Sequence, residues 1–70
     1  MNARNPHASY ADHMESVSRF PNDYAIALHL SHVSPYPEVL AQVRRNVDAG
    51  FFDEEKALNI RKALSRATAA

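Results

Sequence analysis

Cysteine and tryptophan are absent from this chain, and glycine occurs once. Without cysteine, neither a disulfide nor a thiolate zinc site can form, and the absence fits a reducing cytoplasm. No apolar run reaches the ~20 residues of a membrane span, and residues 1–6 lack the apolar segment of a secretory signal. A single glycine excludes the glycine-rich loops that hold phosphates. We therefore expect a cytoplasmic protein that does not contact a membrane.

Seventy residues provide one domain at most. So short a chain buries only about 60% of the surface that its unfolded form exposes. Its apolar fraction, 46%, is that of a folded domain rather than a disordered one. Because no disulfide can form, stability has to come from tight helix packing or from self-association. The pattern predicts one helical domain over residues 9–67, with a flexible tail at 1–8 and a frayed end at 68–70.

Charge is balanced overall but not along the chain. Residues 1–43 hold two basic and four acidic side chains, a net −2, whereas residues 44–70 hold six and four, a net +2. No acid follows Glu55. Cations stabilise the C-terminus of a helix, which explains this distribution without a ligand. A basic patch for nucleic acid is the alternative interpretation, although dedicated DNA-binding proteins are usually far more basic.

Proline and glycine divide the chain into segments of helix length. Apolar residues within these segments recur at helical spacing. The predicted helices cover approximately residues 9–19, 23–33, 37–49 and 54–67. Ser9, with Asp12 three residues later, resembles the capping box that begins a helix. Pro21 disfavours helical geometry in the preceding residue and ends the first helix.

The second segment allows two interpretations. Apolar residues alternate from Tyr24 to Leu30, as they do in a strand. We favour a helix because Ala25 and Ala27 are poor strand formers and no partner strand exists elsewhere in the sequence. Asp23 is suited to cap such a helix. The helix would be apolar nearly all round, which places it in the centre of the fold.

The last two segments carry the clearest signals. Gly50 is typical of the position just past a helix C-terminus, and Asp53 is a good N-cap for the final helix. Phe52 and Ala57 have the spacing of a hydrophobic staple. The short link makes the two helices an antiparallel hairpin. The fold class that follows is all-α: a compact bundle of about four short helices with a C-terminal antiparallel helical hairpin.

Neither catalysis nor metal binding is indicated. The histidines are His7, His13, His29 and His32, and no third ligand accompanies the last two at the spacing of a zinc site. The serines fall in helix caps or on polar faces, and no paired carboxylates lie among apolar positions. A domain this small also has little room for a pocket of ordinary ligand size. We therefore predict a protein that is not an enzyme, with no catalytic residue, no metal and no cofactor.

Residues 26–45 loosely resemble a helix-turn-helix, with Val33-Ser34 at the turn. The turn lacks the usual glycine and is lengthened by Pro35 to Pro37. The recognition helix would begin with Pro37 and Glu38, which are poorly suited to phosphate or base contacts. The resemblance implies a DNA-binding transcriptional regulator as the alternative function. Its predicted nucleic-acid contacts are Arg44, Arg45, Arg61, Lys62 and Arg66.

Protein–protein interaction is the preferred function, because large side chains are left over once the core is made. Leu58 lies off the apolar stripe of the last helix, and Phe51 and Phe52 share a tight turn. Tyr36 is held between two prolines, and tyrosine is favoured at interfaces. The predicted partner-binding residues are Tyr36, Phe51, Phe52, Leu58, Arg61 and Lys62. We predict a small regulatory or inhibitory protein that binds a protein target through apolar helix faces, as a homodimer.

Overall fold

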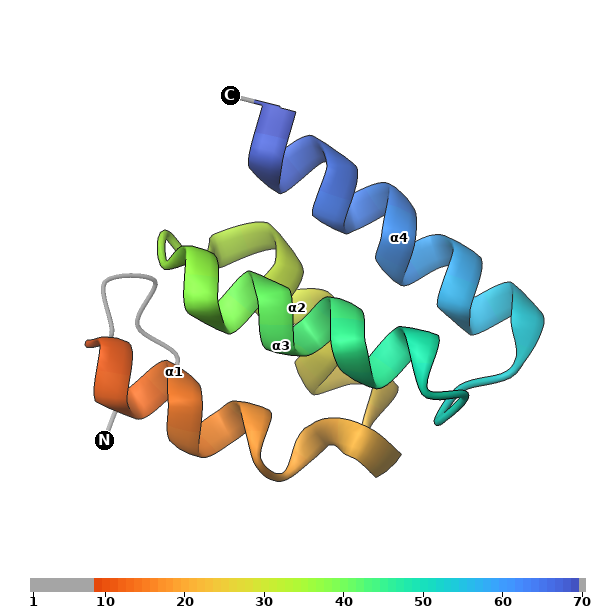
Figure 1. Cartoon of the computed structure of the whole chain (residues 1–70), viewed down its shortest axis with the longest axis horizontal. Helices are drawn as coiled ribbons and strands as arrows, with labels where there is room; N and C mark the ends of the chain where they lie inside the picture. The colour runs from red at the N-terminus through yellow and green to blue at the C-terminus, as the bar shows by residue number, and fades with distance from the viewer. Residues whose placement is uncertain (1–8, 70) are drawn as a thin grey trace.

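The computed structural model describes the backbone of residues 9–69 and the side chains of residues 9–67. Figure 1 shows four α-helices and one short 3₁₀ turn. The elements are α1 (Tyr10–Val17), η1 (Phe20–Asn22), α2 (Tyr24–Val33), α3 (Pro37–Asp48) and α4 (Glu54–Ala69). No strand occurs over residues 9–69, so the all-α prediction is confirmed. The predictions for residues 1–8 and 70 lie outside what is described, and α4 continues through residues 68 and 69, where a frayed end was expected.

The first helix begins as its sequence predicts but ends earlier. The Ser9 hydroxyl accepts a hydrogen bond from the backbone N–H of Asp12 at 3.2 Å, which is one half of the expected capping box. The helix ends at Val17 instead of continuing to residue 19. The chain then tightens into η1, which has Pro21 in its first turn and fully buries the Phe20 ring. Burial of that aromatic ring is a tertiary effect that helix periodicity does not report.

The second segment is a helix, as predicted, and not a strand. The Asp23 carboxylate caps it by accepting hydrogen bonds from the backbone N–H groups of Ala25 at 3.1 Å and Ile26 at 3.3 Å. Ala27 and Ser31 are completely buried, and the Ser31 hydroxyl donates to the Ala27 carbonyl at 2.9 Å. Helix α2 packs against η1 and all three other helices, and its contact with α4 is the most extensive. The prediction of a central helix is therefore confirmed.

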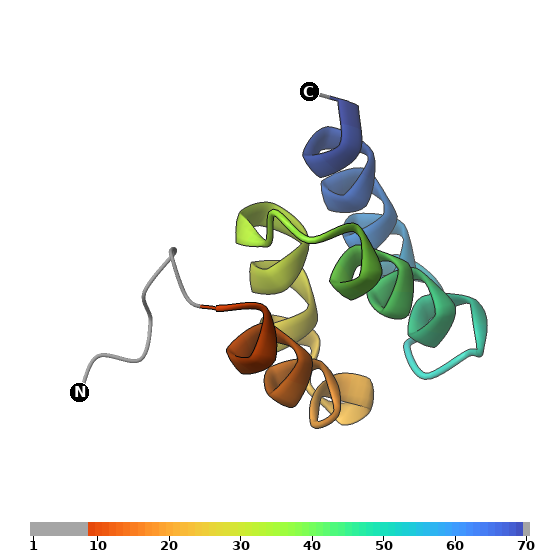
Figure 2. The same ribbon diagram turned by 60° about the vertical axis from the view of Figure 1, so that its left-hand side comes forward.

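Side-chain contacts show how the helices run. Near the starts of α2 and α4, the Asn59 amide donates to the Tyr24 hydroxyl at 3.3 Å, and near their ends Arg66 lies 3.4 Å from His32. These two helices are therefore parallel neighbours. Helices α1 and α3 run the opposite way. Figure 2 shows α2 and α3 in the middle, with α1 and α4 on the outer sides.

The turn between α3 and α4 uses the residues that the sequence indicates. Gly50 has a φ of +88°, and its N–H donates to the Val47 carbonyl at 3.1 Å. The Asp53 carboxylate accepts from the backbone N–H of Lys56 at 2.9 Å and so caps α4. The chain runs in opposite directions along α3 and α4 (Figure 1), which confirms the predicted antiparallel hairpin.

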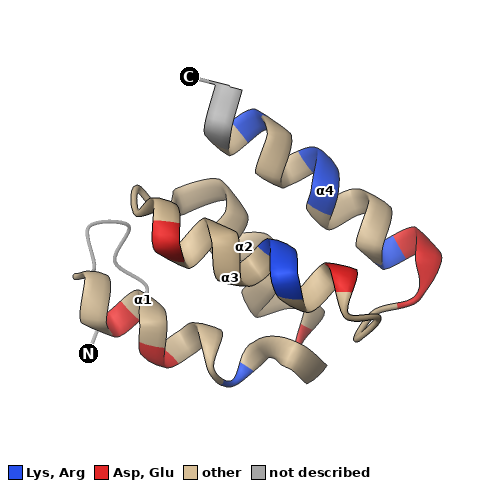
Figure 3. Cartoon of the chain, viewed as in Figure 1, with Lys and Arg blue, Asp and Glu red and all other residues tan. Residues whose placement is uncertain are grey.

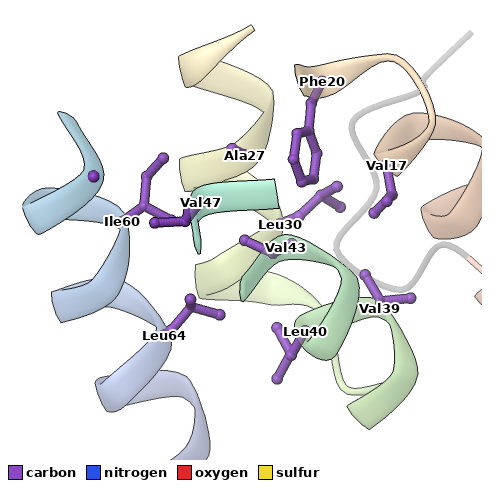
Figure 4. Close-up of a cluster of buried hydrophobic side chains, with 11 residues drawn as sticks. Val17, Phe20, Ala27, Leu30, Val39, Leu40, Val43, Val47, Ile60 and Leu64 are labelled. Carbon is purple, nitrogen blue, oxygen red and sulfur yellow. The ribbon is translucent and has the colours of Figure 1, made fainter. Parts of the chain in front are cut away.

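The core lies between all four helices (Figure 4). Phe20, Ile60 and Leu64 are its largest fully buried side chains. The large apolar residues of α3 recur at helical spacing and are all buried; they are Val39, Leu40, Val43 and Val47. Ala63 on α4 is completely buried as well. The Cα radius of gyration, 11.1 Å, matches the about 11 Å expected of a compact domain of this length.

Candidate protein-binding surfaces

The structure does not bring the six predicted partner-binding residues onto one surface. Tyr36 is half-buried, with its ring centroid 5.3 Å from that of Tyr10 and 5.6 Å from that of His13. Phe52 is half-buried against the core, 6.4 Å from the Phe20 ring. Tyr36 precedes α3 and Phe52 follows it, so a helix about 18 Å long separates them. Both rings therefore contribute to packing within the chain.

Phe51 and Leu58 remain exposed, at 50% and 52% of their surface. Phe51 lies in the turn before α4, and Leu58 lies on the outer side of that helix. Among the described residues, one other large apolar side chain is exposed, Tyr10 on α1. Two of the three large apolar side chains that are exposed among the described residues thus belong to α4 and the turn before it.

Charged residues surround Leu58 in an ordered way. Glu54 and Glu55 lie four and three residues before it, and Arg61 and Lys62 lie three and four residues after it. Residues at these spacings are neighbours on the surface of a helix. All four are exposed, and Figure 3 shows the acids at the start of α4 and cations along the rest of it. We name Phe51, Glu54, Glu55, Leu58, Arg61 and Lys62 the hairpin surface.

One residue of the hairpin surface already has a partner in the chain. The Arg61 guanidinium pairs with the Asp48 carboxylate at the end of α3, at 2.7 Å. Both side chains are more than half exposed, so the pair stabilises the fold by about 1 kcal/mol at most. The Lys62 ammonium has no hydrogen bond or ion pair with any residue from 9 to 67. Of the two cations of the hairpin surface, Lys62 is therefore the one with no partner among the described residues.

A groove of about 710 Å³ lies between α3, α4 and the segment that precedes α3. Its lining residues are Ser34, Pro35, Pro37, Leu40, Ala41, Arg44, Arg45, Asp48, Leu64 and Ala67. The volume falls within the range of ordinary ligand sites, about 300–1,000 Å³. The expectation that so small a domain has little room for such a pocket is wrong. The groove arises because the C-terminal part of α4 packs on α2 and diverges from α3 (Figure 1).

The five cations of the DNA-binding alternative lie on two helices, and three of them contact other side chains of the chain. Arg44 and Arg45 lie on α3, whereas Arg61, Lys62 and Arg66 lie on α4. The Arg45 guanidinium donates to the Gln42 side-chain oxygen at 2.6 Å, and Arg61 pairs with Asp48. Arg66 reaches toward His32 on α2. Exposed Glu38 lies in the first turn of α3, where a recognition helix would need donors.

The histidines do not gather into a site in the part of the chain that is described; His7 lies outside it. Over these residues, no group of three histidine, cysteine or acidic side chains is placed to hold a metal ion. His13 is buried at 4% exposure, and its Nδ1 has no hydrogen-bond partner among residues 9–67. Its edge-on contact with the Tyr36 ring gives it a packing role between α1 and α3.

Comparison with known proteins returned no match to any family model, curated protein or solved structure. None of the described helices combines the length and the apolar character that crossing a membrane requires. Function therefore has to be inferred from the hairpin surface and the groove themselves.

Proposed function

We propose that this protein is a small non-catalytic regulatory or inhibitory protein that acts by protein–protein interaction and forms a homodimer through the hairpin surface. The observation that carries this proposal is the position of Leu58. An exposed leucine lies midway between two acids and two bases on the outer face of α4. That pattern is complementary to itself.

The complementarity follows from two-fold symmetry. In a dimer of this symmetry the same patch meets itself, and two α4 helices cross in opposite directions. With Leu58 opposite Leu58 of the partner subunit, Glu54 falls opposite the partner's Arg61 and Glu55 falls opposite the partner's Lys62, because the members of each pair lie on the same side of the helix seam. Each contact occurs twice. Every acid of the patch then faces a base, and the two leucines meet at the centre.

The expected affinity is modest. Complete burial of a leucine stabilises by about 1.5–3 kcal/mol, and Leu58 has about half of its surface left to bury. Two copies therefore contribute about 2 kcal/mol, and each exposed ion pair adds about 0.2–1 kcal/mol. Burial of the half-exposed Phe51 ring adds to these. Association itself costs several kcal/mol, so these contributions leave less than the about 8 kcal/mol that a micromolar dissociation constant requires, and we expect a weak dimer that forms between micromolar and millimolar concentration.

Sedimentation equilibrium tests this proposal. As the concentration rises from micromolar to millimolar, the wild type should show a species of twice the monomer mass, and Leu58→Glu should shift it to monomer while the helical circular dichroism is retained. Ala11→Glu is the matched control, because it adds the same charge at an exposed helical position on α1, away from α4. A wild type that stays monomeric at millimolar concentration contradicts the homodimer.

A further inference from the structure

We propose that the groove between α3 and α4 is a second binding site, and that it takes an acidic amphipathic helix of a partner protein. This inference rests on the proposed function only in the class of partner, a protein. None of the residues that line the groove belongs to the hairpin surface, so the dimer and the groove can be tested separately.

The shape of the groove matches a helix. Six lining residues come from α3: Pro37, Leu40, Ala41, Arg44, Arg45 and Asp48. They recur at the spacing of one broad helical face and extend over about 16 Å, three full turns. On the opposite side of the groove, α4 contributes Leu64 and Ala67. A groove of this length accommodates an amphipathic helix of about three turns, which is a common mode of peptide recognition.

The lining offers apolar contact with few obstacles. Leu40 and Leu64 form a buried floor, whereas Pro35, Pro37 and Ala41 are open to solvent. Small side chains at Ala41 and Ala67 let the backbone of a docked helix come close. Apolar residues of the ligand would displace water from these surfaces. Nucleic acid does not need such a floor, because its affinity comes mostly from phosphate contacts.

Charge selects the kind of helix. The groove contains two arginines and one acid, and that acid, Asp48, is neutralised by Arg61 at 2.7 Å. Arg44 has no hydrogen bond or ion pair with any described residue. Arg45 donates to the neutral Gln42 amide, so its charge is uncompensated. The rim is therefore positive, and it attracts a helix that carries acids beside its apolar stripe and repels one that carries bases.

Two synthetic peptides test this inference on the full chain. Each has about 14 residues, enough for its stripe to span the groove. One combines a leucine stripe with flanking glutamates, and its twin has lysines in place of the glutamates. Fluorescence anisotropy should show saturable binding of the acidic peptide and at least about tenfold weaker binding of the basic one. Amide chemical shifts should change at Ala41, Arg44 and Ala67 but not along α1.

Variants then locate the site. Arg44→Glu should weaken binding of the acidic peptide by about tenfold, and Arg44→Lys should largely retain it. Arg19→Glu is the control, because Arg19 is an exposed arginine in the turn after α1. Leu58→Glu should abolish the dimer and leave peptide binding unchanged. Arg44→Glu should weaken peptide binding and leave the dimer intact. Equal binding of the two peptides, no effect of Arg44→Glu, no saturation by about 1 mM, or displacement by a DNA duplex at physiological salt overturns the inference.

Discussion

The turn at Gly50 fixes how α3 and α4 meet, and its replacement gives a clean test of the hairpin. Gly50 has a φ of +88°, a region that residues with a Cβ rarely adopt. A Cβ added there would meet no other atom within 4 Å, so Gly50→Ala introduces no clash with neighbouring side chains. The cost is therefore that of the backbone alone. For an L-residue in left-handed geometry it amounts to about 1–2 kcal/mol.

Urea denaturation followed by far-ultraviolet circular dichroism measures this loss. Gly50→Ala should lower the midpoint without changing the slope, since no additional surface is exposed on unfolding. Gly50→Asn should lose less, because asparagine tolerates positive φ. All variants need the same protein concentration, since dimerisation raises the apparent stability by mass action. A Gly50→Ala variant as stable as the wild type would refute the positive φ and with it the geometry of the turn.

Other measurements test the core, the cap and the alternative function. Ile60 is completely buried, so Ile60→Val should cost about 0.5–1.5 kcal/mol and Ile60→Ala about 2–5 kcal/mol in urea melts; equal effects would contradict its central position. Asp53→Ala should cost about 0.5–2 kcal/mol by removing the N-cap of α4, which thermal melts can check. DNA binding should be weak and lost at physiological salt. Two double variants separate the functions. If Arg44→Ala with Arg45→Ala abolishes sequence-specific DNA binding, and Phe52→Ala with Leu58→Ala leaves the activity of the protein unchanged, the DNA-binding alternative is the better one.

Local chemistry made most of the fold predictable. Hydrogen bonds within a few residues of Ser9, Asp23 and Asp53 define where three helices begin, and each cap is readable because its partners are near in sequence. Gly50 was equally readable, because one turn geometry requires it. The ambiguous segment from 24 to 30 was resolved correctly because a strand would have had no partner.

The candidate sites depend on contacts that are distant in sequence. Phe51 and Phe52 are adjacent and chemically identical, and Phe52 is the half-buried one because it packs against the core, next to Phe20. Tyr36 is likewise covered by Tyr10 and His13 from α1. The groove results from α4 packing mainly on α2, and no local pattern reports the angle that this leaves beside α3. Leu58 was identifiable because it departs from the buried stripe of its own helix.

In the proposed homodimer, α4 packs against α4 of the partner subunit in the opposite direction, with Leu58 at the centre of the interface. Charge reversal at one matched pair tests this packing directly. Glu55→Lys and Lys62→Glu each place like charges opposite one another in a homodimer, twice per complex, and leave the Arg61–Asp48 pair untouched. Each exposed pair is worth about 0.2–1 kcal/mol, so self-association should fall several-fold or more in each variant, with helix content unchanged.

An equimolar mixture of the two variants restores both attractive contacts. The lysine introduced at position 55 of one chain then faces the glutamate introduced at position 62 of the other, while the native Lys62 and Glu55 face each other. Sedimentation equilibrium of the separate variants and of their mixture is therefore the decisive measurement. The proposed dimer predicts self-association that is several-fold weaker in each separate sample and restored in the mixture. A mixture that associates no better than its components would contradict it.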